Sequence, residues 1–477
     1  MLDNRTDASY MAEHMLYEVL LFDPRPDSCS KPDIRECSFK LRHWQGQFFY
    51  WLDSKYMPWA DTEMRSFIAN QIQANNFKEV SGGFCTGERY IKSTNRLVTD
   101  IMLYLSGNQG VHLPPNQKLN TWDDDRTGVG EETLSFFNTL LKIPLAGEPE
   151  QLPHTPKFFN ISHIPYNYDK DAKCPSWEKF LDEVMEGDTE RITLLQQWAG
   201  YLFISDNCLQ KFMLIAGEGA NGKTVFTTVI EMLVGEDNVC HIPLSQYSQQ
   251  FALSGMLGKM LNSTSESSHR LDESAETALK SITSGDRMTF HRKYKEPVHT
   301  EPTVKVMIST NQLPNFADKS SGIWRRMLFV PFEVTIPENK QNPSLIYELS
   351  KERLGIFNWA MEGLRNLRKN KRFIEPARCK RAIEEYRRDV NPARAFLLDN
   401  YTPSLCSEPI SCKSLYDKYV EYCFESGYRP MNASNFGKEV KRAFPNIGVA
   451  HLRSGENRER AYEGIEKAYE MNAGYVR

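Results

Sequence analysis

Residues 211–233 read KFMLIAGEGANGKTVFTTVIEML. The central octapeptide, residues 217–224, fits the pattern GxxxxGK[ST]; with 27 glycines in 477 residues, that pattern arises by accident in roughly one such chain in a hundred. An apolar run typical of a β-strand (211–216) precedes it, and a run typical of a helix (225–233) follows it. This strand–loop–helix order predicts a phosphate-binding loop. The alternative is a glycine-rich turn that happens to precede a helix.

The octapeptide carries the chemistry of a nucleotide site. Glycines let backbone N–H groups turn inward around phosphates, and the helix N-terminus adds positive potential. Lys223 would reach the β- and γ-phosphates, and the Thr224 hydroxyl would hold Mg²⁺. We therefore expect ATP and Mg²⁺ as cofactors. The expected cofactor-binding residues are Gly217, Glu218, Gly219, Ala220, Asn221, Gly222, Lys223 and Thr224.

Two polar residues end later strands of the expected sheet. A phosphate loop needs a neighbouring acid to hold metal and polarise water, and Glu266, at the end of residues 260–266, is the best candidate. A solvated loop acid is the alternative. Its rivals at the start of the next expected helix are Asp272 and Glu273. Asn311 ends the apolar strand expected over 303–311, where open α/β sheets bind ligands, or else it is a plain turn residue.

Basic residues gather at two further places. Residues 286–298 read DRMTFHRKYKEPV and predict two short strands around a basic, aromatic tip. Such a tip suits phosphate contacts and stacking on bases, with a solvated hairpin as the alternative. Arg325 and Arg326 precede a strand expected over 328–332, where an arginine can act as a finger toward a neighbour's nucleotide. The alternative is a pair of surface arginines.

The whole chain is typical of an α/β protein. Short apolar runs alternate with helical stretches over residues 210–335, which predicts a parallel sheet, preceded by a helical N-terminal region. Within that region, residues 42–51 indicate a strand, and a helix is expected from Asp61. We expect five segments: a mixed α/β N-terminal region (1–110), a connector and helical domain (111–200), the ATPase core (201–345), a basic helical extension (346–395) and a winged helix–turn–helix (396–477).

Composition excludes several classes of protein. The chain has 58 Lys and Arg against 62 Asp and Glu, a net charge of −4, which argues against a uniformly basic nucleic-acid coat but not against a local basic channel. None of the ten cysteines forms a CxxC pair or a zinc-spaced cluster, which indicates reduced structural thiols. Because no leader and no apolar run near 18 residues is present, we expect no membrane contact and a cytoplasmic location, in the host cell if the gene is viral.

The C-terminal segment has the pattern of a winged helix. In the helix expected over 434–444, Phe436, Val440 and Phe444 share one face, and the cations lie elsewhere. Further arginines surround a turn at residues 454–457, as in a basic wing. The expected DNA contacts are Lys438, Lys441, Arg442 and Arg453. A helical protein-docking domain with a solvated charged face is the alternative.

Taken in order, these motifs resemble those of superfamily-three AAA+ helicases. The chain is similar to the phage/plasmid primase–helicase family, which includes a poxvirus-type replication helicase. The resemblance spans roughly residues 40–465. It rests on the ordered set GEGANGKT (217–224), TSE (264–266), the hairpin at 291–294, NQLP (311–314) and GIWRR (322–326).

The resemblance implies a role for each nucleotide residue. Lys223 and Thr224 would bind MgATP, and Glu266 would be the acid of the second nucleotide motif. Asn311 would be the sensor, and Arg325 or Arg326 the finger that acts on the adjacent subunit. One departure is that many superfamily members carry two adjacent acids where this chain has Ser265 followed by Glu266.

For DNA, the resemblance implies a hexamer that grips single-stranded DNA in its central channel and unwinds forked DNA with 3′-to-5′ polarity. The gripping hairpin would include His291, Lys293, Tyr294 and Lys295. No priming activity is expected, because the 123–125 acid run lies in a loop pattern, so a separate primase or polymerase is an expected partner. An AAA+ initiator or regulator that binds duplex DNA with ATP as a switch is the alternative function, and a non-enzymatic scaffold or a defence ATPase is a third.

Overall fold

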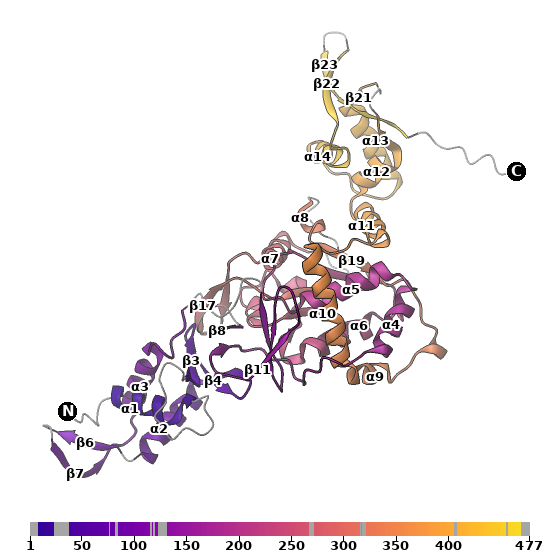
Figure 1. The fold of residues 1–477 in the computed structure, drawn as a ribbon. Helices are drawn as coiled ribbons and strands as arrows, with labels where there is room; N and C mark the ends of the chain where they lie inside the picture. The colour runs from indigo at the N-terminus through magenta and orange to yellow at the C-terminus, as the bar shows by residue number, and fades with distance from the viewer. Residues whose placement is uncertain are drawn as a thin grey trace. The chain divides into compact units, whose positions relative to one another are not determined.

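The computed structural model describes residues 8–22, 38–75, 77–81, 84–114, 117, 120–122, 131–266, 271–314, 316, 321–404, 408–454 and 457–468. The chain forms two compact units, Met1–Pro376 and Ala377–Arg477 (Figure 1). Across these described ranges, no helix is both long and apolar enough to cross a lipid bilayer. The fivefold division expected from the sequence remains a prediction.

A parallel sheet of five strands lies at the centre of the first unit. Its order is β14–β15–β18–β13–β19, and each neighbouring pair is parallel. The strands are β13 (Phe212–Ala216), β14 (Val239–Cys240), β15 (Leu261–Glu266), β18 (Lys305–Thr310) and β19 (Met327–Pro331). All of β19 and most of β13 are buried, as in sheets covered on both faces. The α/β class with a parallel sheet is confirmed.

Helices pack closely around this sheet. Figure 1 shows α5 (Thr189–Tyr201) beside α10 (Arg353–Asn370), and the two helices are in contact. Glycine at positions 200 and 363 permits this close approach, because a Cβ on either residue would collide with the backbone of the other helix. Further helices of this unit are α1 (Ala8–His14), α2 (Asp61–Ala74), α3 (Asn95–Gly107), α4 (Pro175–Met185), α6 (Lys223–Val234), α7 (Glu273–Ser284), α8 (Ser321–Trp324) and α9 (Leu345–Lys351).

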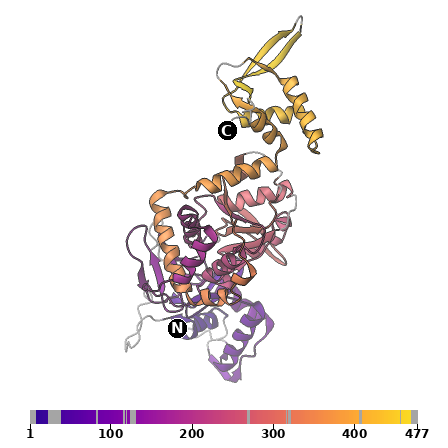
Figure 2. The same cartoon turned by 90° about the vertical axis from the view of Figure 1, so that its right-hand side faces the viewer.

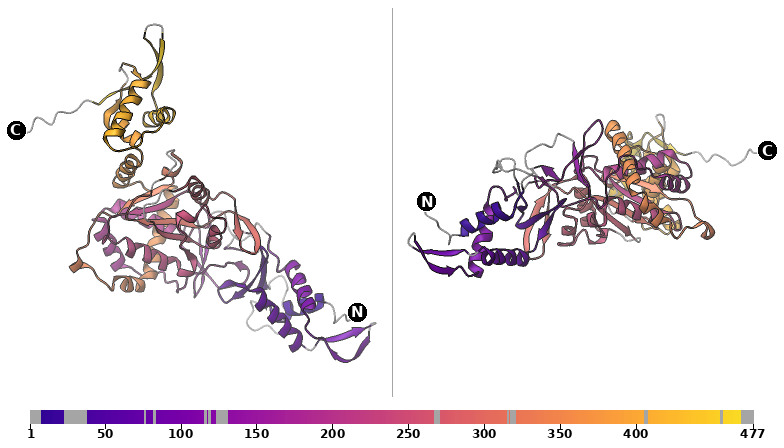
Figure 3. Two further views of the ribbon diagram at one scale, coloured as in Figure 1. Left: turned by 180° about the vertical axis from the view of Figure 1, so that it is seen from behind. Right: turned by 60° about the horizontal axis from the view of Figure 1, so that its bottom comes forward.

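The N-terminal region is mixed rather than helical. Its elements gather at one end of the first unit (Figure 3). The single strand expected over 42–51 is wrong, because Gln45 and Gly46 take positive φ (49° and 74°) and turn the chain between β3 (Leu41–Trp44) and β4 (Gln47–Leu52). The helix expected from Asp61 is confirmed as α2. Further strands before α4 are β1 (Leu21–Phe22), β2 (Ser38–Phe39), β5 (Lys55–Trp59), β6 (Lys78–Ser81), β7 (Phe84–Tyr90), β8 (Thr121–Trp122), β9 (Glu132–Ser135), β10 (Leu140–Ile143), β11 (Glu150–Leu152) and β12 (Phe158–Phe159).

The second unit has its own apolar core. Buried residues of six elements contribute to it, among them Phe396, Tyr419, Phe436 and Ile465. The helices are α11 (Ala377–Asp389), α12 (Pro392–Asn400), α13 (Cys412–Glu425) and α14 (Ala433–Ala443). The strands are β20 (Tyr401–Pro403), β21 (Ile410–Ser411), β22 (Gly448–Ser454), β23 (Asn457–Glu463) and β24 (Ile465–Lys467). In Figure 2 the β22–β23 hairpin extends beyond the helices of its unit.

Candidate functional site

The predicted phosphate loop, called the phosphate loop below, joins β13 to α6. The chain takes positive φ at Gly219 (127°), Ala220 (47°) and Gly222 (87°), a path that favours glycine. At Gly217 a Cβ would collide with the carbonyl oxygen of Phe332, so the loop passes too close to the end of β19 for a larger residue. The strand–loop–helix predicted from the sequence is therefore present.

Lys223 is held inside the loop. Lys223 is only 5% exposed. Its Nζ donates hydrogen bonds to the carbonyl oxygen of Gly217 (2.5 Å) and to Oδ1 of Asn221 (3.0 Å). Burial lowers the pKa of Lys223. Asn221 in turn donates from Nδ2 to the carbonyl oxygen of Phe332 (3.2 Å), which ties the loop to the sheet. This anchoring by Asn221 was not predicted, because no sequence signal pairs it with residue 332.

The rest of the octapeptide is open to ligands. Thr224 is exposed in the first turn of α6, and Glu218 and Ala220 are exposed on the loop. An exposed hydroxyl beside a loop of this conformation fits the binding of phosphates and of a metal ion bridged to them. Among the described residues, no group of three His, Cys, Asp or Glu side chains could hold a metal. The Thr224 hydroxyl is the kind of oxygen donor that fits Mg²⁺ held together with a nucleotide.

Three strand ends meet at the phosphate loop. Ala216 is paired with Thr310, and Thr310 is paired with Glu266, so β13, β18 and β15 end in register at one edge. The amide of Gly217 donates to the carbonyl oxygen of Thr310 (3.3 Å), and Asn311 follows there, exposed. Glu266 ends β15 at this edge, and its side chain lies outside the described residues. The structure thus brings the backbone positions of all three predicted motifs together.

The rival acids have other surroundings. Asp272 caps α7, accepting from the amide of Ala275 (2.6 Å) and the hydroxyl of Ser248 (3.1 Å). Glu273 is the exposed first residue of α7. Capping accounts for Asp272 as a structural residue. The acid run at 123–125 lies outside the described residues.

Arg325 and Arg326 lie at the opposite edge of the sheet. They precede β19, and the amide of Phe212, where β13 begins, donates to the carbonyl oxygen of Arg326 (2.9 Å). Arg326 is engaged within the unit: Nη2 donates to Oγ of Ser284 (2.6 Å) and Nη1 to the carbonyl oxygen of Gly322 (2.9 Å). Burial and the charge of Arg325 lower the pKa of Arg326. Arg325 is exposed.

The predicted hairpin is present as β16 (Met288–Arg292) and β17 (Lys295–Thr300). At its turn, Tyr294 is 92% exposed with a φ of 61°, and Nζ of Lys293 lies 5.1 Å from its ring centroid. Lys295 is also exposed, and its Nζ donates to Oε1 of Gln47 (2.8 Å) on the N-terminal β4. His291 is partly buried beside a register shift in the ladder. The hairpin thus presents an aromatic ring and a cation at its tip.

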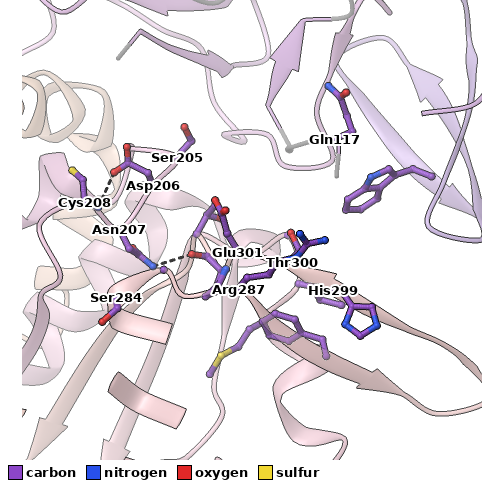
Figure 4. Close-up of a pocket in the computed structure, with 18 residues that line it drawn as sticks. Gln117, Ser205, Asp206, Asn207, Cys208, Ser284, Arg287, His299, Thr300 and Glu301 are labelled. Atoms are coloured by element: carbon purple, nitrogen blue, oxygen red, sulfur yellow. Dashed lines mark hydrogen bonds between the residues drawn. The ribbon is translucent and has the colours of Figure 1, made fainter. Parts of the chain in front are cut away.

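A cavity of about 440 Å³ lies at the base of this hairpin rather than at the phosphate loop (Figure 4). Its lining includes Asp206, Arg287 and His299. Asn207 serves the fold there, since Nδ2 donates to the carbonyl oxygens of Ile282 (2.8 Å) and Pro302 (3.0 Å). These bonds hold the loop before β13 against the segment that leads into β18.

In the second unit, α14 presents cations to solvent. Lys438, Lys441 and Arg442 are exposed, while Phe436 and Val440 are buried, as the sequence pattern predicts. Arg442 forms an ion pair with Glu439 on the same helix. The side chain of Arg453, on β22, lies outside the described residues. Lys438 and Lys441 are thus the clearest candidates for contact with a phosphate backbone.

In comparisons with known proteins, the two units of the chain match different families. Residues 215–326 match a family of unknown function (DUF5906), and residues 391–468 match the RFX DNA-binding domain. The chain is 31% identical over 99 residues to "Uncharacterized mitochondrial protein ymf21" of Marchantia polymorpha, covering 21% of this chain and 55% of that protein. It is 24% identical over 276 residues to "Putative helicase L207/L206" of Acanthamoeba polyphaga mimivirus, covering 50% of this chain and 27% of that protein.

The chain therefore spans about half of the first of these relatives and about a quarter of the second. Among solved structures, the apo C-terminal region of NrS-1 superposes with a TM-score of 0.50 at 12% identity, covering 88% of this chain and 95% of that one. At that identity the likeness concerns the fold alone.

Proposed function

We propose that this chain is an ATP-dependent DNA helicase that acts in replication of a phage, plasmid or other mobile element. The observation that carries the proposal is the shared sheet edge of the phosphate loop, Asn311 and the strand that ends at Glu266. Distant similarity to a mimivirus protein named as a helicase supports a nucleic-acid enzyme with a DNA-related replicative role. The match to the RFX DNA-binding domain supports DNA as a partner.

The residues at that edge support ATP hydrolysis. ATP would draw Nζ of Lys223 away from Gly217 and Asn221 to its β- and γ-phosphates, exchanging hydrogen bonds within the loop for bonds to phosphate. Glu266 and Asn311 would orient a water whose oxygen attacks the γ-phosphorus while the bond to the leaving ADP oxygen breaks, and the proton of the water would pass to the Glu266 carboxylate. Thr224 would hold Mg²⁺ with Glu266, and the ion would neutralise the developing charge.

The opposite sheet edge supports assembly into a ring. Arg325 is separated from its own phosphate loop by the length of β13, five residues or about 16 Å. An arginine at that distance acts on the nucleotide of a neighbouring copy, as in a closed ring with head-to-tail interfaces. A homo-hexamer is the ring we propose, with Lys293 and Tyr294 moving along single-stranded DNA as each subunit hydrolyses ATP.

The proposed substrates are single-stranded and forked DNA, with priming by a separate primase or polymerase. A second candidate function is an initiator or regulator that binds duplex DNA and uses ATP as a switch. The match of residues 391–468 to the RFX DNA-binding domain favours this candidate, because binding to DNA does not by itself require unwinding.

The test is strand displacement on a forked duplex. Lys223→Ala removes the charge that meets the phosphates, so ATP hydrolysis and unwinding should fall at least about 100-fold. Lys293→Ala should lose unwinding yet keep nucleotide binding. Lys351→Ala is the matched control, since Lys351 likewise lies over an exposed tyrosine ring, at 4.2 Å from Tyr347, far from either site in sequence.

The outcomes separate the candidates. ATP hydrolysis by the wild-type chain without strand separation on any forked substrate favours the initiator. Absence of ATP binding by the wild-type chain overturns both functions and leaves a scaffold. Equal loss of unwinding in Lys351→Ala and Lys293→Ala counts against the hairpin as the gripping element.

A further inference from the structure

A basic pocket lies at the sheet edge opposite the phosphate loop. Its volume is about 390 Å³, and five of its ten lining residues are cationic, against one carboxylate, Glu375. We call it the basic pocket and define it by its cations. They are Lys211, Arg325, Arg326, Lys371 and Arg372.

Two of these cations hold the pocket's wall in place. Nζ of Lys211 donates to the carbonyl oxygen of Arg325 (2.6 Å), and the guanidinium of Arg326 is bonded to Ser284 and Gly322. Lys211 and Arg326 therefore serve as positioning residues. Arg325, which also lines the pocket, is exposed.

The other two cations come from the turn after α10. Lys371 takes the left-handed conformation that ends the helix (φ 55°) and, like Arg372, is exposed. Buried contacts hold this turn in place. The buried ring of Phe373 packs edge-to-face on Tyr201, with ring centroids 5.4 Å apart. The amide of Ile374 donates to Oε1 of Gln197 (2.9 Å). Lys371 and Arg372 are thus displayed by a rigid turn.

So many like charges in one concavity repel one another and are stabilised by a bound anion. The anion is not the chain's own nucleotide, because β13 separates the pocket from the phosphate loop by about 16 Å. A triphosphate concentrates about four negative charges at one place. A DNA strand spreads one charge over about 3.4 Å of helix axis, so it matches this convergent cluster less well.

We propose that the basic pocket receives the terminal phosphates of a nucleotide bound to a second copy of this chain, and that Lys371 and Arg372 bind them alongside Arg325. This inference rests on the proposed ATPase function and adds a pair of cations from outside the sheet to the site between subunits. Each active site is then completed by a neighbour's helix-ending turn.

The test is complementation between two inactive variants. Lys371→Ala/Arg372→Ala keeps its phosphate loop but loses the pocket, and Lys223→Ala keeps the pocket but loses the loop. Each alone should hydrolyse ATP at least about 10-fold more slowly than the wild type. Co-expressed with different tags and purified through both, they should recover about a quarter of wild-type activity, since about one interface in four pairs an intact loop with an intact pocket.

Arg365→Ala/Lys369→Ala is the matched control. These two exposed cations lie on α10 just before the turn and do not line the basic pocket, so the variant should keep wild-type ATPase activity. Arg372→Gln alone should reduce the activity less than the double variant. It serves as the second test should the double variant fail to fold, because its mixture with Lys223→Ala should exceed the mean of the two component activities.

Three results would overturn the inference. Mixtures that stay as inactive as their components would mean that the pocket acts on its own subunit or only supports the fold. In that case, ATP hydrolysis by the wild-type chain would still support the proposed function. Loss of single-stranded DNA binding by Lys371→Ala/Arg372→Ala, with ATPase activity intact, would assign the pocket to DNA. A wild-type chain without ATPase activity would overturn the proposed function and this inference together.

Discussion

Lys305 is a buried lysine at the start of β18, the strand that leads to Asn311. It is 1% exposed, and Nζ donates to the carbonyl oxygens of Ile204 (2.9 Å), Asp206 (2.6 Å) and Thr303 (2.9 Å). Burial lowers its pKa to about 8, although the charge of Asp206 opposes the shift. The charge of this lysine therefore depends on pH within a range that experiments can reach.

This shift predicts how stability depends on pH. Between about pH 8 and the ordinary lysine pKa, the folded state binds fewer protons than the unfolded state, so the free energy of unfolding rises with pH in that window. From pH 8 to 10 the Lys305 contribution should rise by about 2 kcal/mol. Lys305→Met, which cannot titrate, is the reference. The difference in thermal midpoint between the two proteins should grow in favour of the wild type, and a constant difference would contradict the prediction.

A second prediction at the scale of single residues concerns Gly217, the first residue of the phosphate loop. Gly217→Ala places a Cβ against the backbone oxygen of Phe332, so the loop must move and the free energy of unfolding should fall by about 1–3 kcal/mol. ATP binding, measured with a fluorescent nucleotide, should weaken at least about 10-fold. Gly107→Ala is the control, because a Cβ there meets open space at the end of α3 and should leave both quantities unchanged. Unaltered ATP binding by Gly217→Ala would contradict the close approach.

At the scale of elements, a substitution at the tip of the β16–β17 hairpin should change DNA binding without changing the stability of the fold. Tyr294 is almost fully exposed at its turn, so Tyr294→Ala should leave the thermal midpoint unchanged. Loss of one base stack should weaken binding to single-stranded DNA by about 1–3 kcal/mol, measured by fluorescence anisotropy. Tyr347→Ala is matched to it, since Tyr347 on α9 is 66% exposed and also has a lysine over its ring. Equal affinities of the two variants would show that the hairpin tip does not stack on DNA.

At the scale of the whole molecule, the chain should separate at residue 377. The second unit has a core of its own, so the fragment 377–477 should unfold in one cooperative thermal transition. If its exposed cations meet phosphates, it should bind duplex DNA with an affinity that falls as salt rises, and Lys438→Ala should reduce the log–log salt slope by about 0.9.

Lys418→Ala is the control for that fragment. Lys418 is exposed on α13, outside α14, so its replacement should leave the salt slope unchanged. A fragment that unfolds without cooperativity would contradict an independent second unit. A fragment that folds but binds no duplex at low salt would favour the protein-docking alternative.

The sequence by itself determined the features that contiguous residues encode. The phosphate loop, the parallel α/β class, the basic hairpin and the amphipathic α14 each depend on local periodicity or on residue types at a fixed spacing. The strand expected over 42–51 failed, because its apolar pattern continues across a turn that only Gln45 and Gly46 reveal. The expectation of a helical N-terminal region failed for a different reason, since short apolar runs do not distinguish paired strands from helices, whereas the expected mixture of helices and strands over 1–110 agrees with α1–α3 and the strands among them.

Only the tertiary structure decided which residues act together. Asn221 anchors the phosphate loop to Phe332, 111 positions away, and Lys211 holds the backbone of Arg325, 114 positions away. The structure also separates Arg326, engaged by Ser284, from the exposed Arg325, and gathers Lys371 and Arg372 beside it. Such contacts depend on strand order and on how helices pack across the sheet, and many sequences with the same local patterns satisfy different long-range pairings. The motifs could therefore be recognised from the sequence. Only the fold showed that they lie at two opposite edges of the sheet, with the phosphate loop at one edge and the basic pocket at the other.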